Sequence, residues 1–259
     1  DILRADNRNP GLLGTVRHEI GSRIIRAART TPESSDLHAM LAEMVAAGCK
    51  SAVMEVSSHS LIQKRVWGVA FDAAVFTNLT HEHLDFHKTM EDYFAAKCIL
   101  FRELGLRNSE AVGVVNADDQ WGRRLLEMPG LEVTMISYGC ERPADVRAEN
   151  IRLGPGESRF DLRTPWGNID GARIGMMGRF NVSNALAATA ACGNFGIKPA
   201  LITDVLSRFQ AAPGRLEEVP TGRGFRVIVD YAHTADALEH VLKALHETGI
   251  GRVILVFGC

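Results

Sequence analysis

Short apolar runs alternate along the chain with segments whose apolar residues recur at helical spacing. Runs at 52–56, 73–76, 111–115 and 133–136 predict strands, and the segments between them predict connecting helices. Strands that alternate with helices form parallel sheets, because each crossover helix returns the chain to the same end of the sheet. The pattern therefore predicts an α/β fold with a central, doubly wound and mostly parallel sheet.

The chain before residue 52 adds smaller elements to this plan. Asp1–Asp6 has the character of a helix end, and two short strands around Gly21-Ser22 predict a hairpin. Ser34 or Ser35 can cap a helix that runs to about Ala47. The residues expected on the apolar face of this helix are Leu37, Leu41, Met44 and Val45.

The alternation of strands and helices is interrupted after residue 145. From Val146 to Arg173, short segments separated by turns at Pro155-Gly156 and Trp166-Gly167 predict an appended antiparallel β section. The elements expected after it are a helix over 182–192, a second helix after Pro199, and a linker at Ala211–Gly214.

A new domain is predicted to begin after this linker. The expected elements are a buried strand over 227–230, a helix over 233–246 and a second strand over 253–257. This is the opening βαβ unit of a Rossmann-like domain. The predicted division is a central domain at 1–210 and the beginning of a further domain at 211–259.

Polar residues capable of chemistry follow two of the apolar runs. Glu55, Ser57 and His59 accompany the run at 52–56. The run at 73–76 is followed by His81, His83, Asp85 and His87. Carboxyl ends of parallel strands meet at one edge of a sheet, so these residues predict one shared site for a metal ion or a phosphate-bearing ligand.

Glu55 strengthens this interpretation because it lies inside an apolar run. A buried, unpaired carboxylate is costly, and a cation beside it would offset that cost. The alternatives at this stage are a solvated polar loop without function and a binuclear zinc hydrolase, whose motif packs HxHxDH. Here Phe86 separates Asp85 from His87, which departs from the hydrolase pattern.

Composition narrows the class of partner. The chain has 259 residues, is 46% hydrophobic and has a net charge of −2, which is typical of a globular protein and gives no reason to expect nucleic acid or an anionic membrane as partner. The scattered cysteines, Cys49, Cys98, Cys140, Cys192 and Cys259, predict reduced and mostly buried thiols of a cytoplasmic protein. No signal peptide or membrane span is expected.

Several motifs together resemble the Mur ligases of bacterial cell-wall synthesis, and within them the MurE type. They are MEVSSHSL from Met54, FTNLTHEHLDFH from Phe76, YFAAK from Tyr93, the Thr30-Thr31-Pro32 turn, Asn116–Asp119, Gly178–Ala185, Gly214–Glu217 and Asp230–Thr234. Their order and spacing agree with the family from end to end. The resemblance implies ATP-dependent addition of a third amino acid, diaminopimelate or lysine, to UDP-N-acetylmuramoyl-L-alanyl-D-glutamate by a monomeric enzyme.

The resemblance also implies roles for individual residues. Glu55, His83 and a carbamylated Lys97 are the expected catalytic residues and Mg²⁺ ligands. The residues expected to bind the nucleotide substrate are Thr30, Thr31, Ser57, Gln63 and Arg65. Those expected to bind ATP are Asn181, Asn184, Arg215 and Asp230. The motif that separates diaminopimelate from lysine in the family is not present before Cys259.

One family motif is missing from the sequence. No GxxxxGK[ST] phosphate-binding loop occurs, although in the family such a loop precedes the helix expected at Asp1–Asp6. We therefore expect a fragment whose 259 residues alone neither hydrolyse ATP nor form an amide bond. A non-catalytic binding remnant of a ligase is the corresponding alternative. Loss of the strand before that loop should leave two strand edges unpaired.

Overall fold

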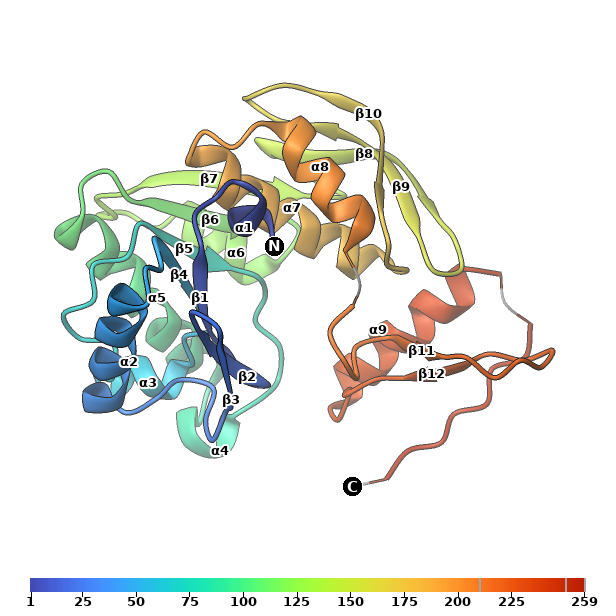
Figure 1. Cartoon of the computed structure of the whole chain (residues 1–259), viewed down its shortest axis with the longest axis horizontal. Coiled ribbons are helices and arrows are strands. Elements are labelled where there is room, and N and C mark those ends of the chain that lie inside the picture. Colours follow the sequence, from blue (N-terminus) through green and yellow to red (C-terminus); the bar gives the residue numbers. More distant parts are fainter. Residues whose placement is uncertain (210, 250, 259) are drawn as a thin grey trace. The chain divides into compact units, whose positions relative to one another are not determined.

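The structure is a computed structural model that describes residues 1–209, 211–249 and 251–258, without the side chain of Asp236 (Figure 1). The chain divides into two compact units. The first unit consists of 1–74, 83–113 and 127–135, and the second of 75–82, 114–126 and 136–259. Each unit is described by itself.

The first unit is built on a four-stranded sheet in the order β3-β2-β1-β4. Its strands are β1 (Pro10–Leu13), β2 (Arg17–Ile20), β3 (Arg23–Arg26) and β4 (Ser51–Met54). Strands β1, β2 and β3 form an antiparallel meander, which confirms the predicted hairpin, whereas β1 and β4 are parallel with Leu13 opposite Met54. The parallel pair brings the carboxyl ends of β1 and β4 together.

Five helices belong to this unit, whose residues the structure describes throughout. The helices are α1 (Ile2–Ala5), α2 (Ser34–Ala46), α3 (Ser58–Ile62), α4 (Leu84–His87) and α5 (Met90–Arg107). The core residues that they share with the sheet are Leu13, Ile20, Leu37, Met44, Leu61 and Val66. Two of these helices, α3 and α4, fall in segments for which the sequence predicted no helix.

Helix α2 corrects two details of the prediction. It begins after Glu33, which caps it without a side-chain hydrogen bond, rather than after Ser34 or Ser35. Leu37 and Met44 are buried as expected, but Val45 is 74% exposed and does not belong to the apolar face. Residues Met44 and Val45 are adjacent, so a helix turns them about 100° apart and only one can face the sheet.

Helix α5 carries strong end signals. The hydroxyl of Thr89 accepts a hydrogen bond from the backbone N–H of Asp92 at 3.0 Å and so caps the first turn. Acidic residues in that turn and Arg107 in the last turn complement the helix dipole. At its end, the Arg107 guanidinium lies 4.3 Å from the ring centre of Trp67, whose side chain is 53% exposed.

A second sheet has six strands in the order β10-β9-β8-β7-β6-β5. The strands are β5 (Ala73–Phe76), β6 (Val112–Asn116), β7 (Thr134–Gly139), β8 (Val146–Leu153), β9 (Ser158–Arg163) and β10 (Ile169–Ile174). Strands β7 and β8 are parallel, whereas β8, β9 and β10 are antiparallel. The predicted α/β class and the appended antiparallel section are confirmed.

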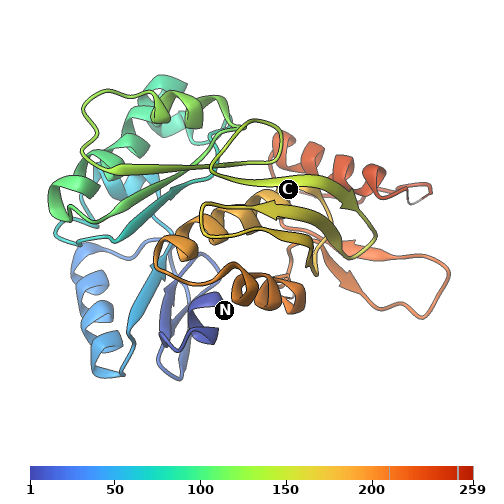
Figure 2. The same ribbon diagram turned by 90° about the horizontal axis from the view of Figure 1, so that it is seen from above.

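The second unit packs helices on this sheet. They are α6 (Gln120–Leu126), α7 (Arg179–Asn194) and α8 (Pro199–Arg208). Figure 2 shows α7 and α8 lying along the antiparallel strands, in agreement with the packing of α7 on β8 and of α8 on β10. Proline at the first position of α8 begins that helix without losing a hydrogen bond.

The last part of the second unit differs from the predicted βαβ opening. Strand β11 (Glu217–Val219) pairs antiparallel with β12 (Val227–Val229), and α9 (Ala235–Glu247) follows. The strand over 227–230 was expected to be buried, but Val227 and Val229 are 38% and 45% exposed. No strand forms over 253–257, where Val256 is 90% exposed. The apolar pattern identified strand-forming residues, but a strand needs a hydrogen-bonding partner that the described chain does not supply there.

Strands β4 and β5 each stand last in their sheet, with one edge that lacks a partner strand in the described part of the chain. Apolar side chains are exposed on both, with Val53 46% and Val75 41% exposed. Strands β3 and β10 stand at the other ends of the two sheets, so the expectation of two edges left by a missing strand stays a prediction.

The cysteines and helices add two findings. Cys98 and Cys192 are buried and Cys49 and Cys140 partly buried, all as free thiols, while the prediction for Cys259 lies outside the described residues. Among the helices that the structure describes, none combines the length and the apolar character that crossing a membrane requires.

Helix α5 leads to a stability prediction at Gly105. An added Cβ there would lie 1.7 Å from the backbone oxygen of Glu132, so backbone must move. We expect Gly105→Ala to destabilise the chain by roughly 1–3 kcal/mol or more, although alanine favours a helix by about 1 kcal/mol. Urea unfolding measures the change. Gly224→Ala, with open space around the new Cβ, is the control, and an unchanged stability of Gly105→Ala would contradict the packing described.

Candidate functional site

The carboxyl ends of β1 and β4 hold Glu55 beside Thr15. The backbone N–H of Glu55 donates to the Leu13 carbonyl at 2.9 Å and continues the parallel ladder by one residue. The Thr15 hydroxyl donates to Glu55 Oε2, and it lies 3.1 Å from the Thr30 hydroxyl. Glu55 Oε1 has no hydrogen bond from the described residues.

Glu55 is placed differently from the expectation. It lies one residue beyond β4 and its side chain is exposed, so the predicted buried charge inside an apolar run is wrong. The edge position of β4 explains the difference, because side chains on an edge strand have no neighbour on one side. The carboxylate is therefore accessible to a ligand rather than hidden from one.

Thr31 ties the predicted substrate-binding segments together. Its hydroxyl, on a residue that is 1% exposed, donates to the Glu55 carbonyl at 2.9 Å and accepts the Ser57 N–H at 3.1 Å. Both hydrogen bonds stay inside the protein, so the Thr31 side chain organises the turn after β4. The accessible hydroxyl of the threonine pair is that of Thr30, which is partly exposed.

Ser57 and Gln63 mark the two ends of α3. Ser57 caps the helix, with its hydroxyl accepting the Ser60 N–H at 3.2 Å. Gln63 is the C-terminal cap and its side chain is exposed. The helix thus carries one predicted substrate-binding residue at each end.

Arg65 belongs to the same cluster. Its Nη1 donates to the Thr31 carbonyl at 3.1 Å, and its Nη2 lies 3.1 Å from a carboxylate oxygen of Glu33. The side chain is 15% exposed, and its buried Nε has no hydrogen-bond partner in the described part of the chain. The planar guanidinium of arginine suits a carboxylate or phosphate group because it can donate two parallel hydrogen bonds.

Histidine rings from the two predicted strand ends meet in the first unit. The ring centre of His59 lies 5.1 Å from that of His83 and 5.4 Å from that of His87. His83 has a left-handed backbone, with φ of 57°, at the start of α4. The structure therefore brings the rings of His59, His83 and His87 together. His81 and Asp85 are exposed, as is His83 itself.

His87 is the buried member of this cluster. It is 4% exposed, its Nε2 lies 2.7 Å from the hydroxyl of Ser58, and its ring stacks on Tyr93 at 4.7 Å. Burial lowers the pKa of His87 below its usual 6.5, and the charges of His59, His83 and Lys97 lower it further. Burial and the charge of His83 likewise lower the pKa of His59.

Lys97 lies on α5 at the margin of the cluster. Its Nζ is 5.2 Å from the ring centre of Tyr93, and the residue is partly buried, as expected. His83 also contacts Tyr93, at 6.0 Å between ring centres. Tyr93 is thus the common neighbour of His83, His87 and Lys97.

The unmodified side chains do not form a metal site. Within residues 1–209, 211–249 and 251–258, no three His, Cys, Asp or Glu side chains are arranged to hold a metal ion. Mg²⁺ takes oxygen ligands, which Glu55 offers and the Lys97 amine does not. The residues fit Mg²⁺ only if Lys97 carries a carbamate, because that change replaces a cation with an anionic oxygen donor.

The predicted ATP-binding residues lie in the second unit. Asn181 is buried and donates to the Met177 carbonyl at 2.9 Å, while Asn184, one turn later on α7, is exposed and lies 3.5 Å from Asn181 Oδ1. Asn181 thus holds the start of α7, and the amide available to a ligand is that of Asn184.

Asp230 and Arg215 shape the segment around β11 and β12. The Asp230 carboxylate accepts the backbone N–H groups of Leu216 and Ala232, both at 2.8 Å. The Arg215 guanidinium lies 5.0 Å from the ring centre of Tyr231 and the residue is exposed. Asp230 therefore fixes the backbone, and Arg215 is the accessible charge of the two.

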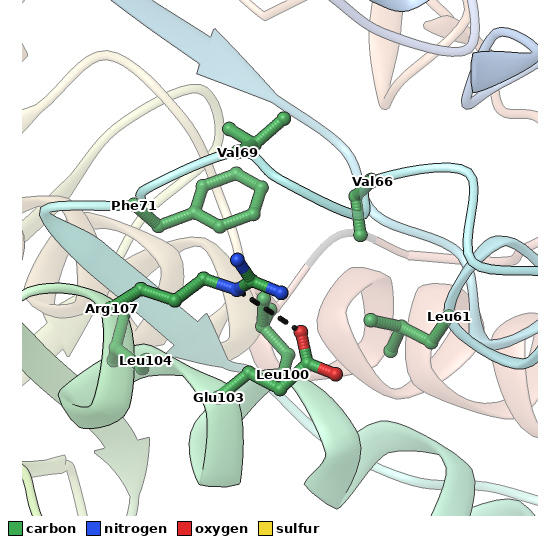
Figure 3. A pocket seen from close by; sticks show the side chains of 8 residues that line it. All are labelled: Leu61, Val66, Val69, Phe71, Leu100, Glu103, Leu104 and Arg107. Carbon is green, nitrogen blue, oxygen red and sulfur yellow. Dashed lines mark ion pairs between the residues drawn. The ribbon is translucent and has the colours of Figure 1, made fainter.

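Two cavities of the structure have no predicted site residue in their lining. Figure 3 shows the side chains that line the first cavity, which are mostly apolar and include the Glu103–Arg107 ion pair. The volume of this cavity is about 10 Å³, room for about one water. Its lining residues are Leu61, Val66, Val69, Phe71, Leu100, Glu103, Leu104 and Arg107. A larger one of about 510 Å³ borders Cys140–Pro143 and Arg147–Glu149, but the N–H groups of 140–142 already bond to Asp118.

Sequence reasoning missed Thr15, Ser58 and Tyr93 as members of the site. Thr15 follows the apolar end of β1, which is the same signal that singled out Glu55 after the next apolar run. Ser58 and Tyr93 gave no such signal, because their roles depend on contacts with His87 across 29 and six positions of sequence. Contacts between distant segments become visible only in the fold.

Comparison with known families identifies the class of protein. Residues 2–192 match the Mur ligase middle domain, and residues 214–259 match the Mur ligase glutamate ligase domain. The chain belongs to the Mur ligase family, which confirms the predicted resemblance.

Named relatives of the chain agree with this family assignment. A UDP-N-acetylmuramoyl-L-alanyl-D-glutamate–2,6-diaminopimelate ligase of Geobacter sulfurreducens is 46% identical over 96% of this chain and 49% of its own length. The ligase of the same name from Streptomyces avermitilis is 43% identical over 97% of this chain and 49% of its own. The chain spans about half the length of the curated relatives it matches.

A solved structure with the same ligase name shares the fold. It superimposes with a TM-score of 0.77 at 27% identity and covers 95% of this chain and 50% of its own. The family membership and this likeness give no support to the binuclear zinc hydrolase considered from the sequence.

Buried His87 leads to a prediction of pH-dependent stability. Its folded pKa lies below the unfolded value of 6.5, so below pH 6.5 the unfolded chain binds more protons and the free energy of unfolding falls. We expect His87→Gln to lose less stability than the parent when the pH is lowered from about 7.5 to about 5.5. Urea unfolding at both pH values measures the difference.

The control for this measurement is His246→Gln, at an exposed position on α9. It should lose as much stability on acidification as the parent. An equal loss in His87→Gln and the parent would show that His87 does not titrate differently in the folded chain.

Proposed function

We propose that the protein containing this chain is an ATP-dependent amide ligase of the MurE type. It would join a third amino acid to UDP-N-acetylmuramoyl-L-alanyl-D-glutamate in peptidoglycan precursor synthesis, in the cytoplasm and as a monomer. The names of the relatives favour diaminopimelate over lysine as that amino acid. The alternative of an inactive ligase fragment applies to the 259 residues taken alone.

The observation that carries this proposal is one hydrogen-bonded cluster in the first unit. Thr30 reaches Glu55 through Thr15, and Thr31 reaches Glu55, Ser57 and Arg65 directly. Four residues proposed for the nucleotide substrate are thus joined, directly or through one neighbour, to the residue whose carboxylate is proposed for the metal. An acyl substrate held there would lie beside the groups that neutralise its reacting oxygens.

The division into domains at 1–210 and 211–259 stays part of the proposal. The family matches at 2–192 and 214–259 fall on either side of this boundary and support it. In the proposed enzyme, the first domain activates the acyl substrate with ATP and the second receives the incoming amino acid.

The proposed reaction has two steps. The γ-carboxylate of D-glutamate takes the terminal phosphoryl group of ATP, which leaves ADP and an acyl phosphate. The amine of the third amino acid then attacks the acyl carbon, an amide bond forms, the C–O bond to phosphate breaks, and the amine loses a proton. Activation is needed because a free carboxylate offers an amine only oxide as leaving group.

Residues of this chain would contribute in distinct ways. Arg65 would bind an anionic group of the nucleotide in place of Glu33, which now occupies one of its donors. Glu55, His83 and the Lys97 carbamate would hold Mg²⁺, which, when bound, offsets charge on the phosphoryl oxygens. Asn184 and Arg215 are exposed and available for ATP, whereas Asn181 and Asp230 would support their positions.

Carbamylation of Lys97 requires the neutral amine, which attacks CO₂ and releases a proton. Lys97 is partly buried, and its Nζ lies 5.2 Å from the ring centre of Tyr93. The modification would reverse the sign of the charge beside His83 and His87.

The first test concerns Lys97 in the full-length ligase. We expect Lys97→Ala to reduce the rate of ligation by more than tenfold, about 1.4 kcal/mol in activation free energy, and bicarbonate or short carboxylic acids to restore part of it. Steady-state assays of amide formation measure both effects. Lys198→Ala, an exposed lysine before α8, is the matched control. More than about a tenth of the parent rate in Lys97→Ala would count against the role.

The second test separates binding from turnover. Arg65→Ala should chiefly raise KM for the nucleotide, because Arg65 contacts ground and transition states alike. Glu55→Ala should chiefly lower kcat, because its proposed metal meets charge that develops in the transition state. Arg26→Ala on exposed β3 controls for the loss of an arginine in the same unit. The reverse pattern of KM and kcat would overturn both assignments.

A further inference from the structure

Thr15 has no role in the proposed function so far, yet it contacts two residues of the site at once. Its hydroxyl donates to Glu55 and lies 3.1 Å from the hydroxyl of Thr30. We propose that Thr15 is a positioning residue that orients the Glu55 carboxylate and makes Thr30 a hydrogen-bond acceptor for the nucleotide substrate. The inference rests on the proposed function, because the metal ion at Glu55 and the nucleotide substrate at Thr30 are both taken from that proposal.

Strand register and a turn place Thr15 beside Glu55. Strands β1 and β4 are parallel with Leu13 opposite Met54, so the residues that follow them emerge side by side. The N–H of Gly14 donates to the Arg17 carbonyl at 3.2 Å and closes the turn that carries Thr15. A Cβ on Gly14 would lie only 3.1 Å from Glu55 Oε1, so glycine leaves room for the carboxylate.

This contact decides which oxygen of Glu55 is presented. Thr15 occupies Oε2, whereas Oε1 has no hydrogen bond within the described residues. An exposed glutamate without such a contact would sample several rotamers, and a metal ion would have to select one of them. With Thr15 in place, the carboxylate is already oriented with one oxygen open.

The same hydroxyl fixes the direction of the next hydrogen bond. A threonine hydroxyl has one proton, and a carboxylate only accepts. Since the Thr15 hydroxyl donates its one hydrogen bond to Glu55, Thr30 is the donor in the hydrogen bond between the two threonines. Thr30 then offers only lone pairs to a ligand.

This polarity specifies the group of the substrate that meets Thr30. It is a hydrogen-bond donor, such as a peptide N–H or a sugar hydroxyl, and not a carboxylate or phosphate oxygen. The anionic groups are left to Arg65, whose guanidinium has only donors. Thr15 thus divides the cluster into a side that accepts and a side that donates.

The test uses the full-length ligase with two substitutions at the exposed Thr15. Thr15→Val keeps the shape and removes the hydroxyl, and Thr15→Ser keeps the hydroxyl. Mn²⁺ binding, measured by electron paramagnetic resonance without nucleotide, should weaken at least fivefold in Thr15→Val and less than twofold in Thr15→Ser. Thr134→Val, an exposed threonine of β7, is the matched control and should bind as the parent does.

A second measurement examines Thr30 without metal or ATP. Calorimetric binding of UDP-N-acetylmuramoyl-L-alanyl-D-glutamate to Thr15→Val, Thr30→Val and the double variant forms a double-mutant cycle. We expect Thr15→Val to weaken binding severalfold in the parent and to have little further effect when Thr30 is valine. Additive effects of the two substitutions would overturn the proposed polarity.

The outcomes separate this inference from the proposed function. A parent that binds Mn²⁺ and nucleotide, with Thr15→Val binding both equally well or Thr15→Ser failing to restore binding, overturns the role of Thr15 alone. A parent that binds neither overturns the proposed function, and the inference falls with it. Thermal melting followed by circular dichroism confirms that the variants remain folded.

Discussion

The site depends on the buried hydroxyl of Thr31. It bonds to the backbone on both sides of the turn between β4 and α3, at Glu55 and at Ser57. Leaving a buried backbone group without a partner costs about 1–3 kcal/mol, so this single hydroxyl satisfies two groups that the turn would otherwise leave unpaired. Glu55 and the cap of α3 take their positions from it, and the backbone carbonyl of Thr31 accepts a hydrogen bond from Arg65.

The sequence could predict most elements because their causes are local. Apolar runs, turn residues and helix caps identified β5, β6 and β7 and helices α2, α7 and α9 to within a few residues, and they identified the span of the antiparallel strands β8 to β10 as a whole. The errors arose where burial or strand pairing depends on neighbouring elements of the fold. Val45 faces outward, and Glu55 is exposed just beyond the end of an edge strand. Residues 253–257 form no strand because no described strand pairs with them.

The candidate site was predictable in its residue types but not in its connections. The motifs singled out Glu55, His83 and Lys97, yet the structure joins His83 and Lys97 through Tyr93, and Glu55 to Thr15. The structure also gives the two threonines different roles. The hydroxyl of Thr31 bonds to buried backbone, whereas the hydroxyl of Thr30 remains accessible. Such a division cannot be read from adjacent identical residues, since burial depends on segments far away in sequence.

Trp67 makes the first unit observable on its own. Of the three tryptophans in the chain, Trp121 and Trp166 belong to the second unit, so indole emission from a chain with phenylalanine at 121 and 166 comes from one place. That indole is half exposed and rests against Arg107 at the end of α5, the helix that carries Lys97. A shift of α5 would change the polarity around the ring, so fluorescence can follow its motion in real time.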